Sequence, residues 1–373
     1  MRKKHGPSLY HMSDKNIFDA MQHKKVTINS MHTALLDRGI LLSNEADKMD
    51  VAEYLASVPH DYHDYQYISS LLESVDRKEP STLTTLEASV SKANITDVCQ
   101  KITKALKDKD EVLKVSQRGD KTILTATYTE IDYTKTELRQ RSTKTATLEV
   151  ENHDGELVIR RPANKKAEEI EGELKSLLSN SLNQVIKQKT ISLESFAQPE
   201  ARSYFFERLI QSIDGYSLFD VKHVDVKYAH TLGEHDDEED EDEDALLGHI
   251  QKAILNGEGV LQSKEFSQLH SSGFYITKIT WQSVPDEMTL DKAEFFASFG
   301  NPESCTDFRY MVRYLYANKE VDTYNKTGKA PTAMEKRNLT RLLEKAAARA
   351  YDAVVAKFGV LETSENNEED EMA

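Results

Sequence analysis

The chain has 373 residues, with 48 Lys plus Arg against 64 Asp plus Glu, so its formal net charge is −16. This length exceeds one typical domain and predicts two or three. No run approaches the ~20 apolar residues that cross a bilayer, and the basic N-terminus lacks the apolar core of a secretory signal. Two cysteines give neither a disulfide framework nor zinc-ligand spacing. We therefore expect a cytoplasmic protein without a membrane segment.

The excess negative charge is concentrated in two short segments. Residues 233–245 contain ten acids and residues 361–373 contain six. The 48 acids that remain equal the 48 basic residues, so the rest of the chain is close to neutral. Both segments are predicted to be disordered, the first as an insertion and the second as a tail. The acidic composition of the whole chain therefore does not exclude nucleic-acid binding.

Residues 1–78 predict a helical module. Ser13 can cap one short helix, and either Thr27 or Asn29 starts a second, which Gly39 ends. Ser43 opens a third helix that stops before Pro59. Short helices joined in this way are typical of a helix-turn-helix or SAP-like module. The expected recognition surface is rich in acids, which repel phosphate, so a packing or partner-binding role is favoured over reading a DNA groove.

Residues 59–65 form the densest group of potential metal ligands. On a helix, His60, His63 and Asp64 would lie close together, and two imidazoles with a carboxylate can hold a divalent metal. Two histidines without an evident third ligand are more often structural, and the interleaved tyrosines could simply form a helix face. No metal or cofactor is predicted, and these three residues are the alternative candidates.

Residues 79–195 predict an α+β domain with a β-meander and a covering helix. Gly155 allows the turn of a hairpin, Pro162 ends the sheet, and Asn164 caps the helix that covers it. The order helix, strands, helix is similar to that of double-stranded-RNA-binding modules, which use lysines at the start of their last helix on phosphates. A further strand at 111–117 departs from that pattern. The expected elements are helices at 83–93, 97–106 and 165–178 and strands at 111–117, 122–133, 143–151 and 156–161.

Basic residues gather at the ends of this predicted unit. Lys165 and Lys166 fall in the first turn of the covering helix, where the macrodipole disfavours cations. A bound phosphate would remove that penalty, because helix N-termini present free N–H groups to anions. Alternatively, Glu168 and Glu169 offset it and the lysines are solvated surface residues. The predicted nucleic-acid-binding residues here are Lys135, Arg139, Arg141, Lys144, Arg160, Arg161, Lys165 and Lys166.

Residues 196–360 predict a second α+β domain, interrupted by the acidic insertion. The capping box Thr332-x-x-Glu335 opens its last helix and Gly359 ends it. The other expected elements are helices at 200–213 and 264–270 and strands at 216–229, 274–282, 293–299 and 308–317. The fold class is therefore α+β: an N-terminal helical module followed by two antiparallel sheet-plus-helix domains.

Two surfaces of this second domain are candidates for nucleic-acid contact. Phe308, Tyr310, Tyr314 and Tyr316 share one parity, so they are expected on one strand face, which could stack bases or form a core beneath the last helix. The last helix also carries a basic stripe, which is a second electrostatic footprint. Its predicted nucleic-acid-binding residues are Arg337, Arg341 and Lys345.

One pattern indicates a possible nuclease. Asp220-Val-Lys222 and Asp225-Val-Lys227 have the carboxylate-x-lysine form of metal-dependent nucleases, with Glu207 on the preceding helix. In such enzymes carboxylates hold Mg²⁺ and the lysine lies near the attacked phosphate. The tripeptide is common, and alternating charge on an exposed strand explains it equally well.

The sequence lacks a nucleophile elbow, a P-loop, a dinucleotide fingerprint, a kinase motif set and a zinc motif, which argues against the common enzyme classes. The leading prediction is a non-enzymatic nucleic-acid-associated protein that holds phosphate through the two basic groups. The first alternative is a protein–protein adaptor or regulatory subunit of a larger cytosolic complex, such as a bacterial antiviral defence complex. The second is a metal-dependent nuclease acting through Asp220, Asp225 or His60.

Overall fold

The computed structural model describes residues 11–43, 45–72, 79–107, 111–119, 121–153, 155–229, 252–287, 290–320 and 323–359. The chain forms two compact units. Unit 1 comprises Met1–Arg77, Lys92–Leu148 and Gly172–Leu178, and unit 2 comprises Lys78–Ser91, Glu149–Glu171 and Ser179–Ala373. The domain boundaries that the sequence predicts at residues 78, 195 and 360 remain predictions. The acidic segments 233–245 and 361–373 lie outside the described residues.

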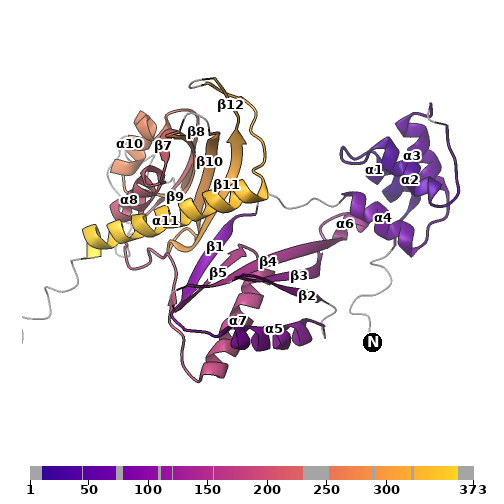
Figure 1. Cartoon of the computed structure of the whole chain (residues 1–373). Coiled ribbons are helices and arrows are strands. Elements are labelled where there is room, and N and C mark those ends of the chain that lie inside the picture. Colours follow the sequence, from indigo (N-terminus) through magenta and orange to yellow (C-terminus); the bar gives the residue numbers. More distant parts are fainter. Residues whose placement is uncertain are drawn as a thin grey trace, which may run out of the picture. The chain divides into compact units, whose positions relative to one another are not determined.

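Four helices form the N-terminal part of unit 1 (Figure 1): α1 (Asp14–Met21), α2 (Ile28–Leu36), α3 (Lys48–Ser57) and α4 (Tyr62–Leu72). The predicted cap of α1 is confirmed, because Ser13 forms a capping box. Of the two starts predicted for α2, Thr27 is the cap and also forms a capping box. The predicted start of α3 is wrong. Asp47 caps it by accepting the amide of Asp50 at 2.8 Å, whereas the Ser43 hydroxyl accepts the nearby amide of Glu45.

The rest of unit 1 consists of helices and strands that follow the bundle in the chain. They are α5 (Lys92–Lys107), β2 (Val112–Arg118), β3 (Lys121–Ile131), α6 (Glu137–Gln140) and the first part of β4 (Arg141–His153). The strand order is β2-β3-β4. Leu138 of the short helix α6 is buried in the core of the helical bundle, and its carbonyl accepts a hydrogen bond from the Ser69 hydroxyl. The buried Leu138 side chain and this hydrogen bond therefore hold α6 against the helical bundle.

Unit 2 begins with a strand where a helix was expected. Residues 83–93 were predicted to be helical, but β1 (Ser81–Leu86) is a strand and α5 does not begin until Lys92. The segment Ser-Thr-Leu-Thr-Thr-Leu is rich in β-branched residues, and Thr82, Thr84 and Leu86 are buried alternately. Pairing with β5 (Glu156–Pro162) and β11 (Thr306–Tyr316) fixes this conformation. The cap of α7 (Lys165–Leu182) by Asn164 is confirmed.

The remaining strands of unit 2 continue the sheet in the order β5-β1-β11-β10-β9-β7-β8. Neighbouring strands in this order are antiparallel. Pro199 starts α8 and the Thr332 capping box starts α11, as predicted. The further elements are α8 (Pro199–Gln211), β7 (Tyr216–Tyr228), β8 (Lys252–Asn256), α10 (Lys264–Ser271), β9 (Phe274–Pro285), β10 (Lys292–Asn301), β12 (Asn318–Glu320), β13 (Thr323–Tyr324) and α11 (Ala333–Phe358), with the short β6 (Gln188–Lys189) beside β1.

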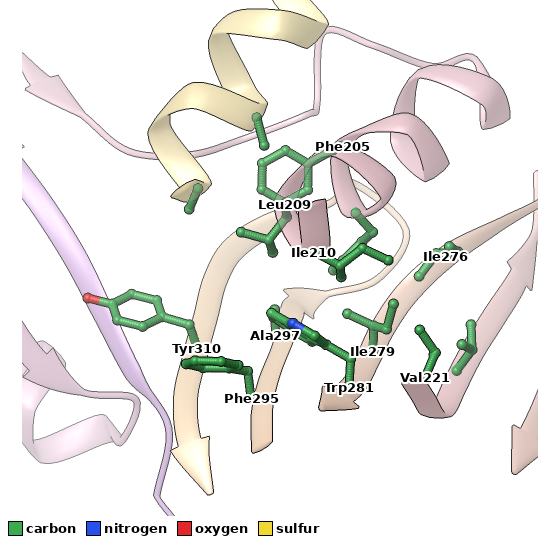
Figure 2. Packing of buried hydrophobic residues seen from close by; sticks show 14 of the residues in the cluster. Phe205, Leu209, Ile210, Val221, Ile276, Ile279, Trp281, Phe295, Ala297 and Tyr310 are labelled. Atoms are coloured by element: carbon green, nitrogen blue, oxygen red, sulfur yellow. The ribbon is translucent and has the colours of Figure 1, made fainter. Parts of the chain in front are cut away.

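The main core of unit 2 lies on one face of this sheet. Helices α8 and α11 pack side by side and cover it (Figure 1). Phe205 and Leu209 of α8 point toward the sheet, where Trp281 of β9 and Phe295 of β10 stack with 5.5 Å between ring centroids (Figure 2). Burial of these large aromatic side chains is the main driving force that holds the helices on the strands.

A β-bulge changes the predicted face of two tyrosines. Phe308, Tyr310, Tyr314 and Tyr316 were expected on one face of β11. Instead, Val312 pairs with Phe295 and Tyr314 pairs with Glu294, so Arg313 is an extra residue in β11. Phe308 and Tyr310 face the core, whereas Tyr316, which pairs with Lys292, lies on the opposite face. The prediction of one aromatic face is therefore wrong.

The α+β fold class is confirmed, with helices on a large antiparallel sheet. Among the helices that the structure describes, none combines the length and the apolar composition needed to span a bilayer.

Candidate nucleic-acid interface

Arg160 and Arg161, expected to contact phosphate, are engaged in ion pairs within unit 2. Arg160 donates from Nε to Oε1 of Glu344 at 2.6 Å and from Nη1 to Oε2 of Glu151 at 2.6 Å. Arg161 pairs with Glu171. The Glu344 and Glu171 side chains are only 8% and 4% exposed. Removing either guanidinium would leave a buried carboxylate without its cation, so these arginines hold the fold together.

The basic stripe of α11 is also partly paired. Arg341 reaches Oε1 of Glu151 at 3.1 Å, so Glu151 of β4 bridges Arg341 and Arg160. Arg337 and Lys345 are exposed on α11. At the start of α7, Lys165 is exposed and Lys166 lies 2.8 Å from Glu169. The cations of unit 2 that remain at the surface are therefore fewer than the sequence indicated.

The predicted cations of unit 1 have acidic neighbours as well. Lys135 lies 3.2 Å from Asp132, and Lys144 lies 2.5 Å from Glu130. Arg139 is exposed in α6 and Arg141 is half-buried at the start of β4. Exposed ion pairs of this kind contribute little to stability and are weakened by salt, so they leave the lysines accessible to a polyanion.

Residues 59–65, which contain His60 and His63, run into the first turn of α4. Asp61 Oδ1 accepts the amides of His63 and Asp64, at 2.8 and 2.9 Å. His60 is buried, with Nε2 2.7 Å from the Leu55 carbonyl oxygen and Nδ1 3.3 Å from Asp64 Oδ2. Because both ring nitrogens of His60 already face oxygen atoms, the imidazole has a structural role here. Within the described ranges, no group of three His, Cys, Asp or Glu side chains could hold a metal ion.

The residues of the nuclease pattern are not brought together. Asp220 accepts the Gly259 amide at 2.8 Å and pairs with Lys222 at 2.7 Å, while Lys227 pairs with Glu303. Glu207 belongs to α8, which covers the core face of the sheet. Asp225 lies on the other face, because its neighbours Val224 and Val226 point into the core.

The face of the unit 2 sheet opposite this core, which we call the open face, carries polar and charged side chains. Alternation along β9 and β10 places Lys278, Thr280, Glu294 and Phe296 there, between core residues such as Ile279 and Phe295. A groove of about 550 Å³ lies on it. Its lining includes Lys222, His223, Asn256, Lys278, Thr280, Glu294, Phe296, Met311 and Arg313.

Next to the groove, the positive and negative charges around one carboxylate, Asp225, are not balanced. Asp225, with a side chain 6% exposed, lies 2.5 Å from His223 Nε2, 3.3 Å from Lys252 Nζ and 3.5 Å from Lys278 Nζ. We call His223, Asp225, Lys252 and Lys278 the Asp225 cluster. His223 Nδ1 also contacts the side-chain oxygen of Asn256. Two ammonium groups therefore face one negative charge at distances too long for strong hydrogen bonds.

A second buried carboxylate, Glu294, lies in the groove, with a side chain 8% exposed. Its Oε2 accepts hydrogen bonds from Tyr316 at 2.7 Å and from Gln282 at 3.2 Å, while Oε1 lies 3.4 Å from Arg313 Nη1. Burial raises the pKa of the Tyr316 hydroxyl, and the Glu294 carboxylate that it contacts raises it further. Tyr316 therefore stays a hydrogen-bond donor to Glu294 at neutral pH.

Lys292 adds a buried cation to the open face. Its side chain sits among aromatic rings, with Nζ 4.3 Å from the centroid of Phe219 and 5.0 Å from that of Tyr316. Burial lowers the pKa of this ammonium group, and the nearby Lys222 lowers it further. The cation–π contacts stabilise the charged form in a position where water is largely excluded.

The open face was not predicted from the sequence as a site. Strands β7, β9, β10 and β11 were predicted, whereas β8, which carries Lys252 and Asn256, was not. Alternation along β10 already separates Glu294 and Phe296 from the core residues between them. The register that brings β7, β8 and β11 beside them was not visible. No protein-family model and no curated protein sequence matches the chain.

Proposed function

We propose that the chain is a non-enzymatic nucleic-acid-associated protein and that the open face of unit 2 is its contact surface for the phosphate backbone. The Asp225 cluster carries this proposal. One carboxylate cannot neutralise both Lys252 and Lys278, whose side chains are 57% and 36% exposed, so a net positive charge is accessible to solvent. Phosphate is the anion that such lysines bind in nucleic acids.

Three of the other predicted cations lie outside the open face, on α7 and α11. Arg337, Lys345 and Lys165 are exposed in unit 2 and add positive charge without being held in a buried pair. Arg160 and Arg161 are excluded as primary contacts because they neutralise buried acids. A cytoplasmic location and membership of a larger defence or regulatory complex belong to the same proposal, and co-purification from the native host tests the latter.

The experiment is a fluorescence-anisotropy titration with labelled duplex DNA, duplex RNA and single strands at several salt concentrations. The test variant is Lys252→Ala/Lys278→Ala. The matched control is Lys24→Ala/Lys25→Ala, which removes the same charge from exposed positions of unit 1. We expect the test variant to reduce the slope of log K against log salt by about 1–2, since each phosphate contact contributes about 0.7–0.9. We expect the control to bind like the wild type.

Two results would overturn the proposal. If the test variant binds with wild-type affinity and salt dependence, the open face is not the contact surface. If the wild-type protein binds no nucleic acid at low salt, nucleic-acid recognition by the chain alone is wrong. The protein–protein adaptor then replaces it, with co-purification of a partner as its test. Addition of Mg²⁺ to the same samples tests the nuclease alternative, because cleavage would require it.

A further inference from the structure

The groove on the open face has the dimensions of a ligand site. Its volume of about 550 Å³ lies within the 300–1,000 Å³ typical of sites for small ligands. A single nucleotide fits such a space, whereas a base within a duplex cannot enter because it is stacked and paired. If the open face binds nucleic acid as proposed above, the groove therefore favours a single strand.

The groove offers an apolar platform next to its charges. Phe296 and Met311 are directly paired on adjacent strands, and Phe296 is also paired with Thr280. Paired residues of neighbouring strands point to the same side of a sheet, so the ring and the thioether form one continuous surface. Bases stack on aromatic side chains whatever their identity, which gives affinity without sequence preference. His223 and Lys278 of the Asp225 cluster line the same groove, so the cluster can hold the adjoining phosphate.

Glu294 adds a group that distinguishes between bases. Its Oε2 is occupied by Tyr316 and Gln282, but Oε1 has only the 3.4 Å contact with Arg313. A carboxylate oxygen accepts a hydrogen bond from an exocyclic amino group, as of cytosine, and repels a carbonyl oxygen. Thymine and uracil have no amino group and present carbonyl oxygens on both sides of their single N–H. Arg313, beside Glu294, can donate to the ring nitrogen N3 next to the amino group of cytosine or to the carbonyl oxygen on the far side of N3.

We infer that the groove binds one unpaired base of a single-stranded nucleic acid, stacked on Phe296 and Met311, and that Glu294 selects a base with an amino group over thymine or uracil. This inference rests on the proposed function. It assigns to the protein a preference for single strands and a base-reading carboxylate.

The test compares labelled oligo(dC) and oligo(dT) of equal length with wild-type protein and with Glu294→Gln. We expect the wild type to bind oligo(dC) about tenfold more tightly than oligo(dT), within the range of discrimination by one base contact. Glu294→Gln keeps the size of the side chain but removes its charge, so the preference should fall to about twofold or less. Phe296→Ala should weaken both oligonucleotides by a similar factor and keep the ratio.

The outcomes separate this inference from the proposed function. If the wild type binds both oligonucleotides in a manner that depends on Lys252 and Lys278 but shows no preference, only the base-reading role of Glu294 is overturned. If duplex DNA binds more tightly than single strands, the single-strand assignment is overturned. If the wild type binds nothing at low salt, the proposed function fails first. The wild-type comparison needs no variant, so it holds even if Glu294→Gln does not fold.

Discussion

Arg160 of β5 and Glu344 of α11 are separated by 184 residues in the chain, yet Nε and Oε1 lie 2.6 Å apart. The Tyr310 hydroxyl donates to the same Glu344 oxygen at 2.6 Å, and Arg160 also binds Glu151. Strands β4, β5 and β11 are thereby joined to the last helix through one partly buried network. Arg160, which was predicted to bind phosphate, thus contributes to the internal contacts of unit 2.

The first prediction concerns this pair. Arg160→Ala leaves the Glu344 carboxylate largely buried without its cation, so we expect the free energy of unfolding to fall by about 3 kcal/mol. Urea denaturation followed by circular dichroism measures the change. Arg337→Ala removes an exposed side chain of α11, the helix that carries Glu344. It should change the free energy of unfolding by about 0.5 kcal/mol or less. Equal stability of the two variants would show that the network does not hold α11. A binding experiment with Arg160→Ala requires this check of folding first.

The second prediction concerns the start of α11. Thr332 accepts the Glu335 amide, and Glu335 Oε2 accepts the Thr332 amide at 2.8 Å. Thr332→Ala should lower the free energy of unfolding by about 1 kcal/mol, whereas Thr332→Ser should retain it. The Thr332 amide and hydroxyl lower the pKa of Glu335 below its ordinary value of 4.5. The contribution of the ionised carboxylate is therefore present above pH 4.5 and is lost as pH falls through the lowered pKa. If Thr332→Ala lowers the free energy of unfolding by the same amount in acid as at neutral pH, the stated role of the ionised Glu335 carboxylate is wrong.

The third prediction concerns the two thiols. Burial raises the pKa of Cys99, in unit 1, and of Cys305, in unit 2, to about 11. At pH 8 only about 0.1% of each is thiolate, so the native protein should react with iodoacetamide far more slowly than free cysteine. The raised pKa means that the folded state is favoured while the thiol is protonated. The contribution of the buried thiol to the free energy of unfolding is therefore complete below pH 9 and is lost as pH rises toward 11. Cys99→Ser and Cys305→Ser assign the reaction to each unit. Rapid labelling of either cysteine at pH 8 would show that its thiol is accessible to the reagent and not buried.

The fourth prediction concerns His60. His60→Ala removes the contact with the Leu55 carbonyl and should lower the stability of unit 1 by about 1–2 kcal/mol. His63→Ala changes an exposed neighbour and should have an effect within about 0.5 kcal/mol. Calorimetric titration with Zn²⁺ and Mn²⁺ tests the metal alternative. Binding by the wild type that both variants abolish would restore a metal site at this position.

The sequence by itself determined the features that depend on a few neighbouring residues. Ser13, Thr27, Asn164 and Thr332 cap helices because each side chain reaches an amide three residues away, and this needs no distant partner. Alternation of apolar and polar residues within β4 and β5 likewise follows from the local sequence and contributed to the prediction of the α+β class. Where two local signals compete, as in the Leu- and Thr-rich segment 81–86, pairing with β5 decided for a strand.

The tertiary structure alone decided which polar residues meet. The bulge at Arg313 turns Tyr316 to the open face, and it depends on the register of β10 against β11. The pairing of Arg160 with Glu344 and the gathering of Lys252 and Lys278 around Asp225 depend on contacts between segments far apart in the chain. Composition and spacing carry no information on strand register or helix docking, because the burial of the whole core selects them. These contacts place Arg160 and Arg161 in ion pairs with buried acids and make the open face the candidate site that we propose.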